Sequence, residues 1–174
     1  MTGNANPTFN TFHLLNIQSI KSRRENKYVE LEKHLEKYKP SAMLLTETWL
    51  TEKQNFAMPR YDIIRTDRPT GKRGGGTAIL INKNYAHERI TFKDKLEQIE
   101  ITAIKIICEN NPLAVAVIHK KPNNKIIKRE LEIVMNTLKT ITDDIIIGGD
   151  FNASHFLYGS NINSNIPIFT HSKT

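Results

Sequence analysis

Apolar residues recur along this chain at two different periods, which predict helices alternating with strands. Two stretches repeat every three or four residues, the spacing of one apolar helix face. The first ends at Pro40 and carries Tyr28, Leu31, Leu35 and Tyr38. The second predicts a helix over residues 125–141 and carries Ile127, Leu131, Val134, Leu138 and Ile141. Ser22 and Glu25 have the spacing of a capping box ahead of the first helix.

Short β-branched and apolar runs between these stretches predict the strands. Residues 11–17 and 42–47 flank the first helix, and a final strand begins at Ile145 after the second helix. Each end of the chain therefore predicts a strand–helix–strand unit with parallel pairing. Further strands are predicted over residues 62–66, 77–82, 87–92, 99–107 and 113–118. The pattern as a whole predicts a layered α/β sandwich with two sheets.

Composition places the chain among ordinary globular domains. Its 174 residues, of which 39% are hydrophobic and 25% charged, suit one domain over residues 11–174 after a flexible, polar segment at residues 1–10. The net charge of +7 favours a polyanionic partner such as nucleic acid, with a merely soluble basic protein as the alternative. A single cysteine excludes an internal disulfide, and no apolar run is long enough to span a membrane. These features predict an intracellular protein with no membrane partner.

Two acidic residues follow buried strands. Ile145, Ile146 and Ile147 lead into Gly148, Gly149, Asp150, Phe151 and Asn152. Glu47 follows the apolar run at residues 42–45 in the same way. Polar chemistry is concentrated where buried strands end in loops. Two carboxylates at such ends suit one hard cation and the phosphate oxygens that it holds.

Three neighbouring features have less specific interpretations. The run Gly74, Gly75 and Gly76 is interpreted as a hairpin connection, because it lacks the Lys-Ser ending and the helix of a phosphate-binding loop. Trp49 is predicted to pack in the core, and His34 to be solvated on the charged side of the first helix.

Four segments follow one another in an order that resembles a known superfamily. They are Leu-Asn-Ile-Gln-Ser-Ile around Asn16, Leu-Leu-Thr-Glu-Thr-Trp-Leu around Glu47, Arg-Thr-Asp-Arg followed by Gly-Gly-Gly-Thr-Ala-Ile-Leu-Ile, and Gly-Gly-Asp-Phe-Asn-Ala-Ser-His. From Phe12 to Gly159 the chain resembles the endonuclease/exonuclease/phosphatase superfamily. More narrowly, it is similar to the endonuclease domain of jockey-like non-LTR (LINE-type) retrotransposons.

The resemblance implies a four-layer α/β sandwich of the deoxyribonuclease I type and Mg²⁺-dependent cleavage of phosphodiesters, with Mn²⁺ as an alternative ion. By the same resemblance Glu47 binds the metal, and Asn16 orients the site and the phosphate. Asp150 positions or deprotonates the attacking water, and Asn152 hydrogen-bonds the scissile phosphate or that water. His155 matches a histidine whose role in the family is less defined.

The resemblance also implies a partner and a location. The substrate is DNA, nicked in the nucleus before reverse transcription, and the further partners are the element's RNA or the reverse transcriptase of the same polyprotein. His119 stands where the family has a phosphate-binding tyrosine, so its help would depend on pH. Basic loop residues are expected to contact the DNA backbone: Arg68, Lys72, Arg73, Lys120 and Lys121.

The chain departs from the family pattern at its end. The 174 residues contain neither the family's closing Asp nor its Ser-Asp-His element. We therefore expect a sandwich that is incomplete at the C-terminus, and weak or no activity from these residues alone. The alternatives are a non-catalytic nucleic-acid-binding remnant and, in the same superfamily, a phosphoesterase of a lipid substrate.

Overall fold

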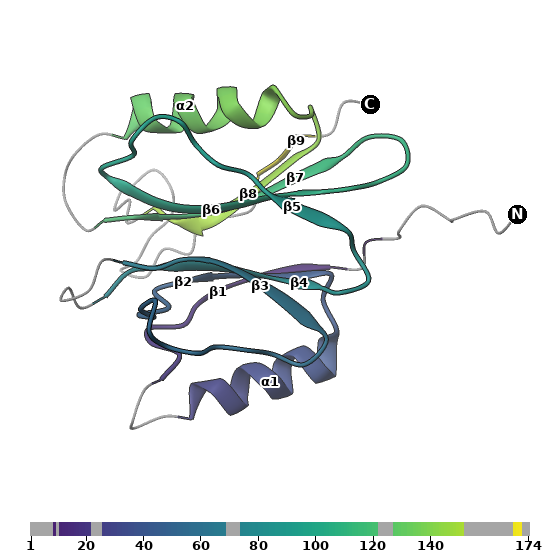
Figure 1. Ribbon diagram of the computed structural model, residues 1–174, viewed down its shortest axis with the longest axis vertical. Coiled ribbons are helices and arrows are strands. Elements are labelled where there is room, and N and C mark those ends of the chain that lie inside the picture. The colour runs from purple at the N-terminus through teal and green to yellow at the C-terminus, as the bar shows by residue number, and fades with distance from the viewer. Residues whose placement is uncertain are drawn as a thin grey trace, which may run out of the picture.

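The chain folds into four layers, with one helix on the outer face of each of two stacked sheets (Figure 1). The computed structural model describes residue 9 and residues 11–21, 26–68, 74–121, 127–151 and 169–171. The four-layer α/β sandwich expected from the sequence is confirmed. Within the described residues neither helix has the length and apolar character needed to cross a bilayer. Of the N-terminal segment predicted to be flexible, only Phe9 is described, so that prediction remains open.

The first sheet has the strand order β1-β2-β4-β3. Strand β1 (Phe12–Asn16) and strand β2 (Ala42–Thr46) pair in parallel, and helix α1 (Lys27–Tyr38) connects them, as the sequence predicted. Strand β4 (Thr77–Asn82) runs antiparallel to β2 and also to β3 (Tyr61–Thr66). The glycine run before β4 therefore belongs to a β-hairpin connection, which confirms the sequence-based interpretation.

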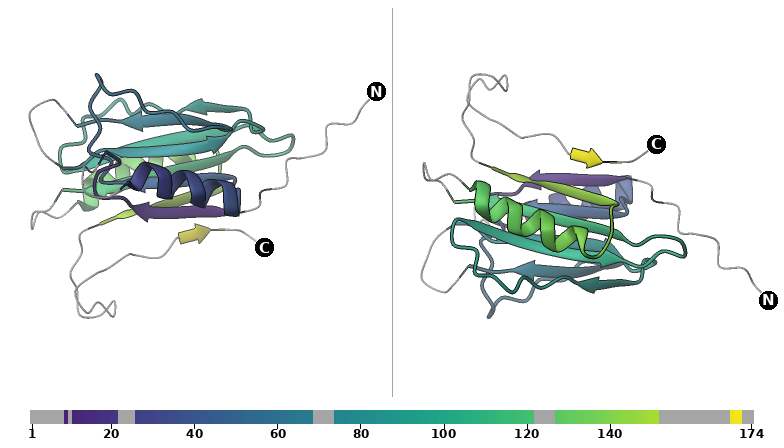
Figure 2. Two further views of the ribbon diagram at one scale, coloured as in Figure 1. Left: turned by 90° about the horizontal axis from the view of Figure 1, so that it is seen from below. Right: turned by 90° about the horizontal axis from the view of Figure 1, so that it is seen from above.

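The second sheet has the order β5-β6-β7-β8-β9. Strands β5 (His87–Arg89), β6 (Ile99–Ile106) and β7 (Leu113–Lys120) form an antiparallel meander. Helix α2 (Lys128–Lys139) then crosses to β8 (Ile145–Asp150), which pairs with β7 in parallel as predicted. Strand β9 (Phe169–His171) pairs antiparallel with the other side of β8 and lies at the outer edge of the sheet in both views of Figure 2.

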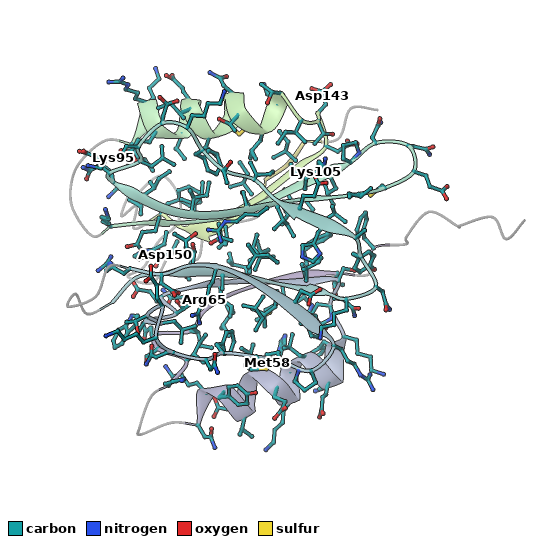
Figure 3. All side chains as sticks on the ribbon, in the orientation of Figure 1. Met58, Arg65, Lys95, Lys105, Asp143 and Asp150 are labelled. Carbon is teal, nitrogen blue, oxygen red and sulfur yellow. The ribbon has the colours of Figure 1, made fainter. Side chains whose placement is uncertain are left out.

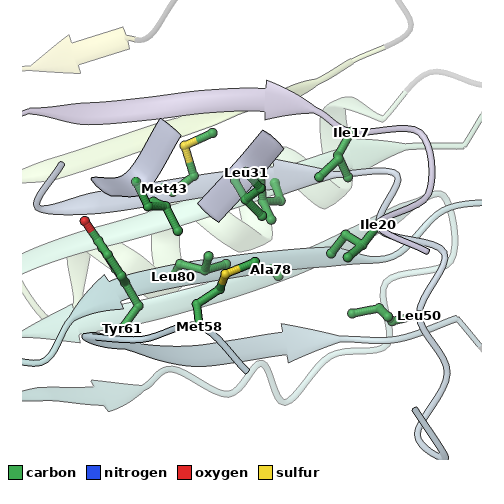
Figure 4. Packing of buried hydrophobic residues seen from close by; sticks show 11 residues of the cluster. Ile17, Ile20, Leu31, Met43, Leu50, Met58, Tyr61, Ala78 and Leu80 are labelled. Carbon is green, nitrogen blue, oxygen red and sulfur yellow. The ribbon is translucent and has the colours of Figure 1, made fainter. Parts of the chain in front are cut away.

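Apolar side chains fill the spaces between the layers. Leu31 and Leu35 of α1 pack on Met43, Leu80 and their neighbours in the first sheet (Figure 4). Side chains between the two sheets have no exposed surface: Leu44, Ile79, Ile104, Val115 and Val117. Burial of each such side chain contributes about 2 kcal/mol. Because β2 is covered on one face by α1 and on the other by the second sheet, its sequence is a continuous apolar run rather than an alternating one.

Several element boundaries differ from the sequence prediction. Helix α1 begins at Lys27, with Asn26 at its N-cap position and no side-chain cap, so the predicted capping box does not mark its start. The residues of that box, 22–25, lie outside the described part of the chain. Strand β5 is shorter than the predicted 87–92. Strand β7 is two residues longer than predicted, because its ladder with β6 continues to the pair Ile99–Lys120. That extension puts His119 inside a strand.

His34 is not the solvated residue that the sequence predicted. Its Nε2 lies 2.8 Å from Nδ1 of His13, and both rings contact Tyr38. Burial, His13 and Lys37 each lower the pKa of His34. The prediction failed because His34 neighbours the apolar stripe of α1, so docking of that stripe carries the imidazole onto β1.

Candidate active site

Polar side chains from both sheets meet at one end of the sandwich. In the second sheet Glu100, His119 and Asp150 are direct partners across β6, β7 and β8. Directly paired residues of neighbouring strands present their side chains on the same face of the sheet. Figure 3 labels Asp150 between the two sheets, at the left end of the molecule in that view. One acid, one imidazole and a second acid therefore form a row across this sheet.

Asn16 and Glu47 come from the adjacent end of the first sheet. Asn16 is the last residue of β1 and pairs with Thr46, so Glu47 directly follows the last residue of β2. The amide Nδ2 of Asn16 donates to Oδ2 of Asp150 over 2.9 Å. This bond joins residues 134 positions apart and ties the two sheets together. The amide oxygen of Asn16, Oδ1, is buried and accepts no hydrogen bond within the described residues.

His119 lies between two carboxylates and has no exposed surface. Its Nε2 is 2.6 Å from Oε1 of Glu47, and its Nδ1 is 3.0 Å from Oε2 of Glu100. Nδ1 hydrogen-bonds Glu100, whereas Nε2 lies at ion-pair distance from Glu47 without the geometry of a hydrogen bond. Burial by itself would lower the pKa of His119, but the hydrogen bonds to Glu100 and Glu47, and their charges, outweigh burial and raise the pKa to about 9. At neutral pH the site therefore holds an imidazolium.

Glu47 is held by several donors. Besides His119, the indole Nε1 of Trp49 lies 2.5 Å and the backbone N of Gly75 lies 2.8 Å from its Oε2. The contact with His119 first, and then these two donors, lower the pKa of Glu47 to about 2 against the opposing effect of burial. Trp49 is partly exposed and makes this polar contact, so the predicted role in core packing is wrong.

Glu100 is a site residue that the sequence analysis did not identify. Burial favours its neutral form, but hydrogen bonds from His119, Arg68 and Gly76 lower its pKa to about 2. The Nε atom of Arg68 donates to its Oε1 over 2.7 Å. Arg68, expected to contact DNA, thus pairs with an acid, and its side chain is only 16% exposed. A glutamate between Ile99 and Ile101 was the available signal, but alternation by itself indicates a solvated face.

The donor set of the site suits a hard cation. Carboxylate and amide oxygens are the ligands that Mg²⁺ takes in proteins, and the ion retains several waters. Glu47 supplies such oxygens, and the buried Oδ1 of Asn16 is an acceptor that lacks a hydrogen-bond donor within the described residues. In that same part of the chain no three acidic, histidine or cysteine side chains cluster closely enough to form a metal site by themselves. The oxygens of Glu47 and Asn16 are of the kind that such an ion takes.

Other predicted site residues are only partly described. Asn152, His155, Lys72 and Arg73 lie outside the described residues, so their predicted roles stay predictions. Lys120 is 7% exposed and its ammonium group donates to the carbonyl of Lys121. The ammonium group of Lys121 in turn donates to the carbonyl of Glu97. Both lysines lie at the end of β7, next to His119.

The coupled charges predict how stability depends on pH when metal is removed. The depressed pKa values of Glu47 and Glu100 stabilise the fold above the ordinary value of 4.5, and this stabilisation is lost as the pH falls toward 2. The raised pKa of His119 stabilises the fold below pH 6.5, and this contribution is lost as the pH rises through about 9. The free energy of unfolding can be measured with urea in EDTA for the wild type and for His119→Asn. The difference between the two should be largest between pH 4.5 and 6.5. A difference that grows between pH 6.5 and 9.5 would contradict these charge states.

The fold and this end of the sandwich define the class of the protein. Two stacked sheets with a helix on each outer face form the four-layer sandwich of the deoxyribonuclease I-like fold. The family model described as the Endonuclease/Exonuclease/phosphatase family matches residues 8–168. The chain belongs to this family, which confirms the resemblance drawn from the four sequence segments.

Two individual relatives are retrotransposon proteins. The chain is 26% identical over 134 residues to the RNA-directed DNA polymerase from mobile element jockey of Drosophila funebris, and 25% identical over 131 residues to that of Drosophila melanogaster. The alignments cover 75% of this chain and 14% of each relative. The chain therefore corresponds to a small part of those proteins.

Solved structures share the fold at lower identity. The endonuclease domain of TRAS1, a telomere-specific non-LTR retrotransposon, superposes with a TM-score of 0.62 at 15% identity, covering 87% of this chain and 63% of that domain. A family member from Bacteroides thetaiotaomicron gives a TM-score of 0.60 at 17% identity, covering 84% and 64%. TDP2 from D. rerio, complexed with a single-strand DNA product, gives 0.56 at 16% identity, covering 82% and 60%.

Proposed function

We propose that these residues form part of a retrotransposon endonuclease that nicks target DNA by Mg²⁺-dependent hydrolysis of a phosphodiester. The observation that carries this proposal is the hydrogen bond from Asn16 to Asp150, which brings two segments of the family pattern together. Asn16 also pairs with Thr46, the residue before Glu47. The jockey relatives and the net charge of +7 support DNA as the substrate. A protein that acts on chromosomal DNA works in the nucleus, with the reverse transcriptase or RNA of the same element as partner.

Each described side chain has a task in this proposal. Asn16 donates to one oxygen of Asp150, which orients this carboxylate to accept a proton from the attacking water. Glu47, with the oxygen of Asn16, would hold Mg²⁺ or Mn²⁺. When bound, that ion would neutralise phosphate charge and lower the pKa of a bound water. Asn152, by resemblance, hydrogen-bonds the phosphate or that water.

Charge balance around His119 favours approach of a polyanion. The carboxylates of Glu47 and Glu100 face the imidazolium of His119 and the guanidinium of Arg68, so two positive charges offset two negative ones. Because both nitrogens of His119 face carboxylates, donation to phosphate requires the contact between Nε2 and Glu47 to open. His119 thereby acts first as a counter-ion and then as a donor.

These residues alone should be weak catalysts. They contain no Ser-Asp-His element, whose histidine in the family stabilises charge at the phosphate. Loss of such a donor costs about 3 kcal/mol of transition-state stabilisation, roughly a hundredfold in rate. Slow nicking is therefore expected, seen with protein in excess over DNA.

A plasmid assay with a binding control tests this function. Supercoiled plasmid in low salt should be converted slowly to the open circle with Mg²⁺, and not with EDTA. Asp150→Asn keeps the size of the side chain and its contact with Asn16, and should abolish nicking while DNA binding persists. Equal nicking by Asp150→Asn would refute the assignment. Salt-sensitive binding without any nicking by the wild type would instead support the non-catalytic nucleic-acid-binding remnant.

A further inference from the structure

The glycine run before β4 contacts both carboxylates of the site through its backbone. Gly75 N donates to Oε2 of Glu47 over 2.8 Å, and Gly76 N donates to Oε2 of Glu100 over 2.7 Å. Glu47 follows a strand of the first sheet, whereas Glu100 belongs to β6 of the second sheet. Two successive N–H groups of one turn therefore hold acids from different sheets.

The turn itself is fixed against the segment after β2. The backbone N of Trp49 donates to the carbonyl of Gly75 over 2.9 Å, and that of Thr48 donates to the carbonyl of Gly76 over 3.3 Å. Trp49 also donates its indole N–H to Glu47. The peptide groups of the turn consequently bond on one side to this segment and on the other to the two carboxylates.

The guanidinium of Arg68 occupies the space that a side chain at position 75 would take. A Cβ atom at Gly75 would lie 2.5 Å from Cζ, Nε and Nη2 of the guanidinium. The guanidinium therefore lies directly against the backbone of Gly75, the position from which its Nε reaches Glu100. At Gly76 an added Cβ would come within 2.5 Å of the Thr48 hydroxyl. A side chain at either position would displace a neighbour.

Gly74 has a backbone conformation similar to that of Gly75, but it has more room for a side chain. The values of φ are +88° at Gly74, +77° at Gly75 and +84° at Gly76, so alanine meets the same left-handed backbone strain at each. A Cβ at Gly74, however, would make only ordinary contacts, the nearest 3.6 Å from Oε2 of Glu47. Position 74 is thus a matched control for position 75.

We propose that Gly75 and Gly76, with Arg68 packed on Gly75, are positioning residues that set the placement of Glu47 and Glu100 on either side of His119. The loop was interpreted from the sequence as a mere hairpin connection. Its N–H groups serve carboxylates of the protein rather than phosphate. The proposal deepens the proposed function and rests on it for its catalytic consequence, whereas the geometry can be tested without catalysis.

Amide NMR of the metal-free protein tests the placement. Hydrogen bonds to carboxylates shift amide protons downfield and slow their exchange with solvent. Glu47→Gln should move the Gly75 amide resonance more than that of Gly76, and Glu100→Gln should do the reverse. Because Glu88 is a surface acid paired with Lys105, Glu88→Gln should move neither. If neither substitution moves the amide resonances of Gly75 and Gly76, the proposal is overturned.

Coupling between Gly75 and Arg68 tests the positioning role. Gly75→Ala should reduce nicking at least tenfold relative to Gly74→Ala, with similar losses in unfolding temperature. In an Arg68→Ala background the further loss from Gly75→Ala should fall below twofold, because the displaced side chain is already absent. Equal losses from Gly75→Ala in both backgrounds would overturn the role of Arg68. If the wild type does not nick at all, the proposed function fails, whereas the NMR pattern still decides the placement.

Discussion

Replacement of His119 by alanine is expected to lower the free energy of unfolding by about 3 to 5 kcal/mol near pH 6, the range for breaking a buried ion pair. The substitution leaves Glu47 and Glu100, whose side chains are 18% and 10% exposed, facing each other without the cation between them. It also opens a cavity, because the imidazole has no exposed surface. Urea unfolding in EDTA measures the loss.

The control for this prediction removes the unpaired charges. In the background Glu47→Gln with Glu100→Gln, the same His119→Ala substitution should cost less than half as much, because only packing and neutral hydrogen bonds remain to be lost. A cost that is equal in both backgrounds would show that His119 acts through packing alone. A cost below about 1 kcal/mol in the wild-type background would contradict a buried ion pair.

Replacement of Glu47 by glutamine is expected to reduce Mg²⁺-dependent nicking at least about a hundredfold, or about 2.7 kcal/mol. Glutamine keeps the length of the side chain and one oxygen that can accept from Gly75 and Trp49. It removes the negative charge that would attract the cation. If activity is lost while the fold is retained, the loss results from the missing negative charge at position 47 and not from a change in side-chain size.

Metal binding provides the independent measurement for Glu47. Competition of Mg²⁺ with bound Mn²⁺, followed by electron paramagnetic resonance, should show weaker binding of both ions to Glu47→Gln. Glu88→Gln removes an acid that pairs with Lys105, which Figure 3 shows away from Asp150, and should leave binding and nicking unchanged. Unaltered metal affinity in Glu47→Gln would place the cation elsewhere.

Sequence periodicity predicted the architecture because the helices and the central strands bury patterned faces. The stripe of α2 supplies Val134 and Leu138 to the core, and the uninterrupted apolar run at β2 matches a strand covered on both faces. Boundaries were predicted less well where tertiary pairing extends or shortens an element. The extra residues of β7 exist because β6 offers partners for them, which no local pattern reveals.

The candidate site was predicted to the extent that its residues follow strands. Asn16, Glu47 and Asp150 end or follow strands, and the order of four segments indicated the family. Glu100 was not predicted as a site residue, because a polar residue is ordinary in a strand. Only the register of β6 with β7 places it beside His119. The role of the glycine run was not predicted either, because the sequence does not show which backbone N–H groups donate to a side chain.

The sequence by itself determined the elements from β1 to β8, the family and the acids at the strand ends. Hydrophobic burial and the chemistry of strand termini both produce local sequence patterns. Only the tertiary structure decided that His119 is an imidazolium between two carboxylates, that Arg68 pairs with Glu100, and that the glycine turn holds both acids. These features depend on strand register and on distances of a few ångströms between remote residues. Electrostatic coupling is sensitive to such distances, whereas hydrophobic patterning is not.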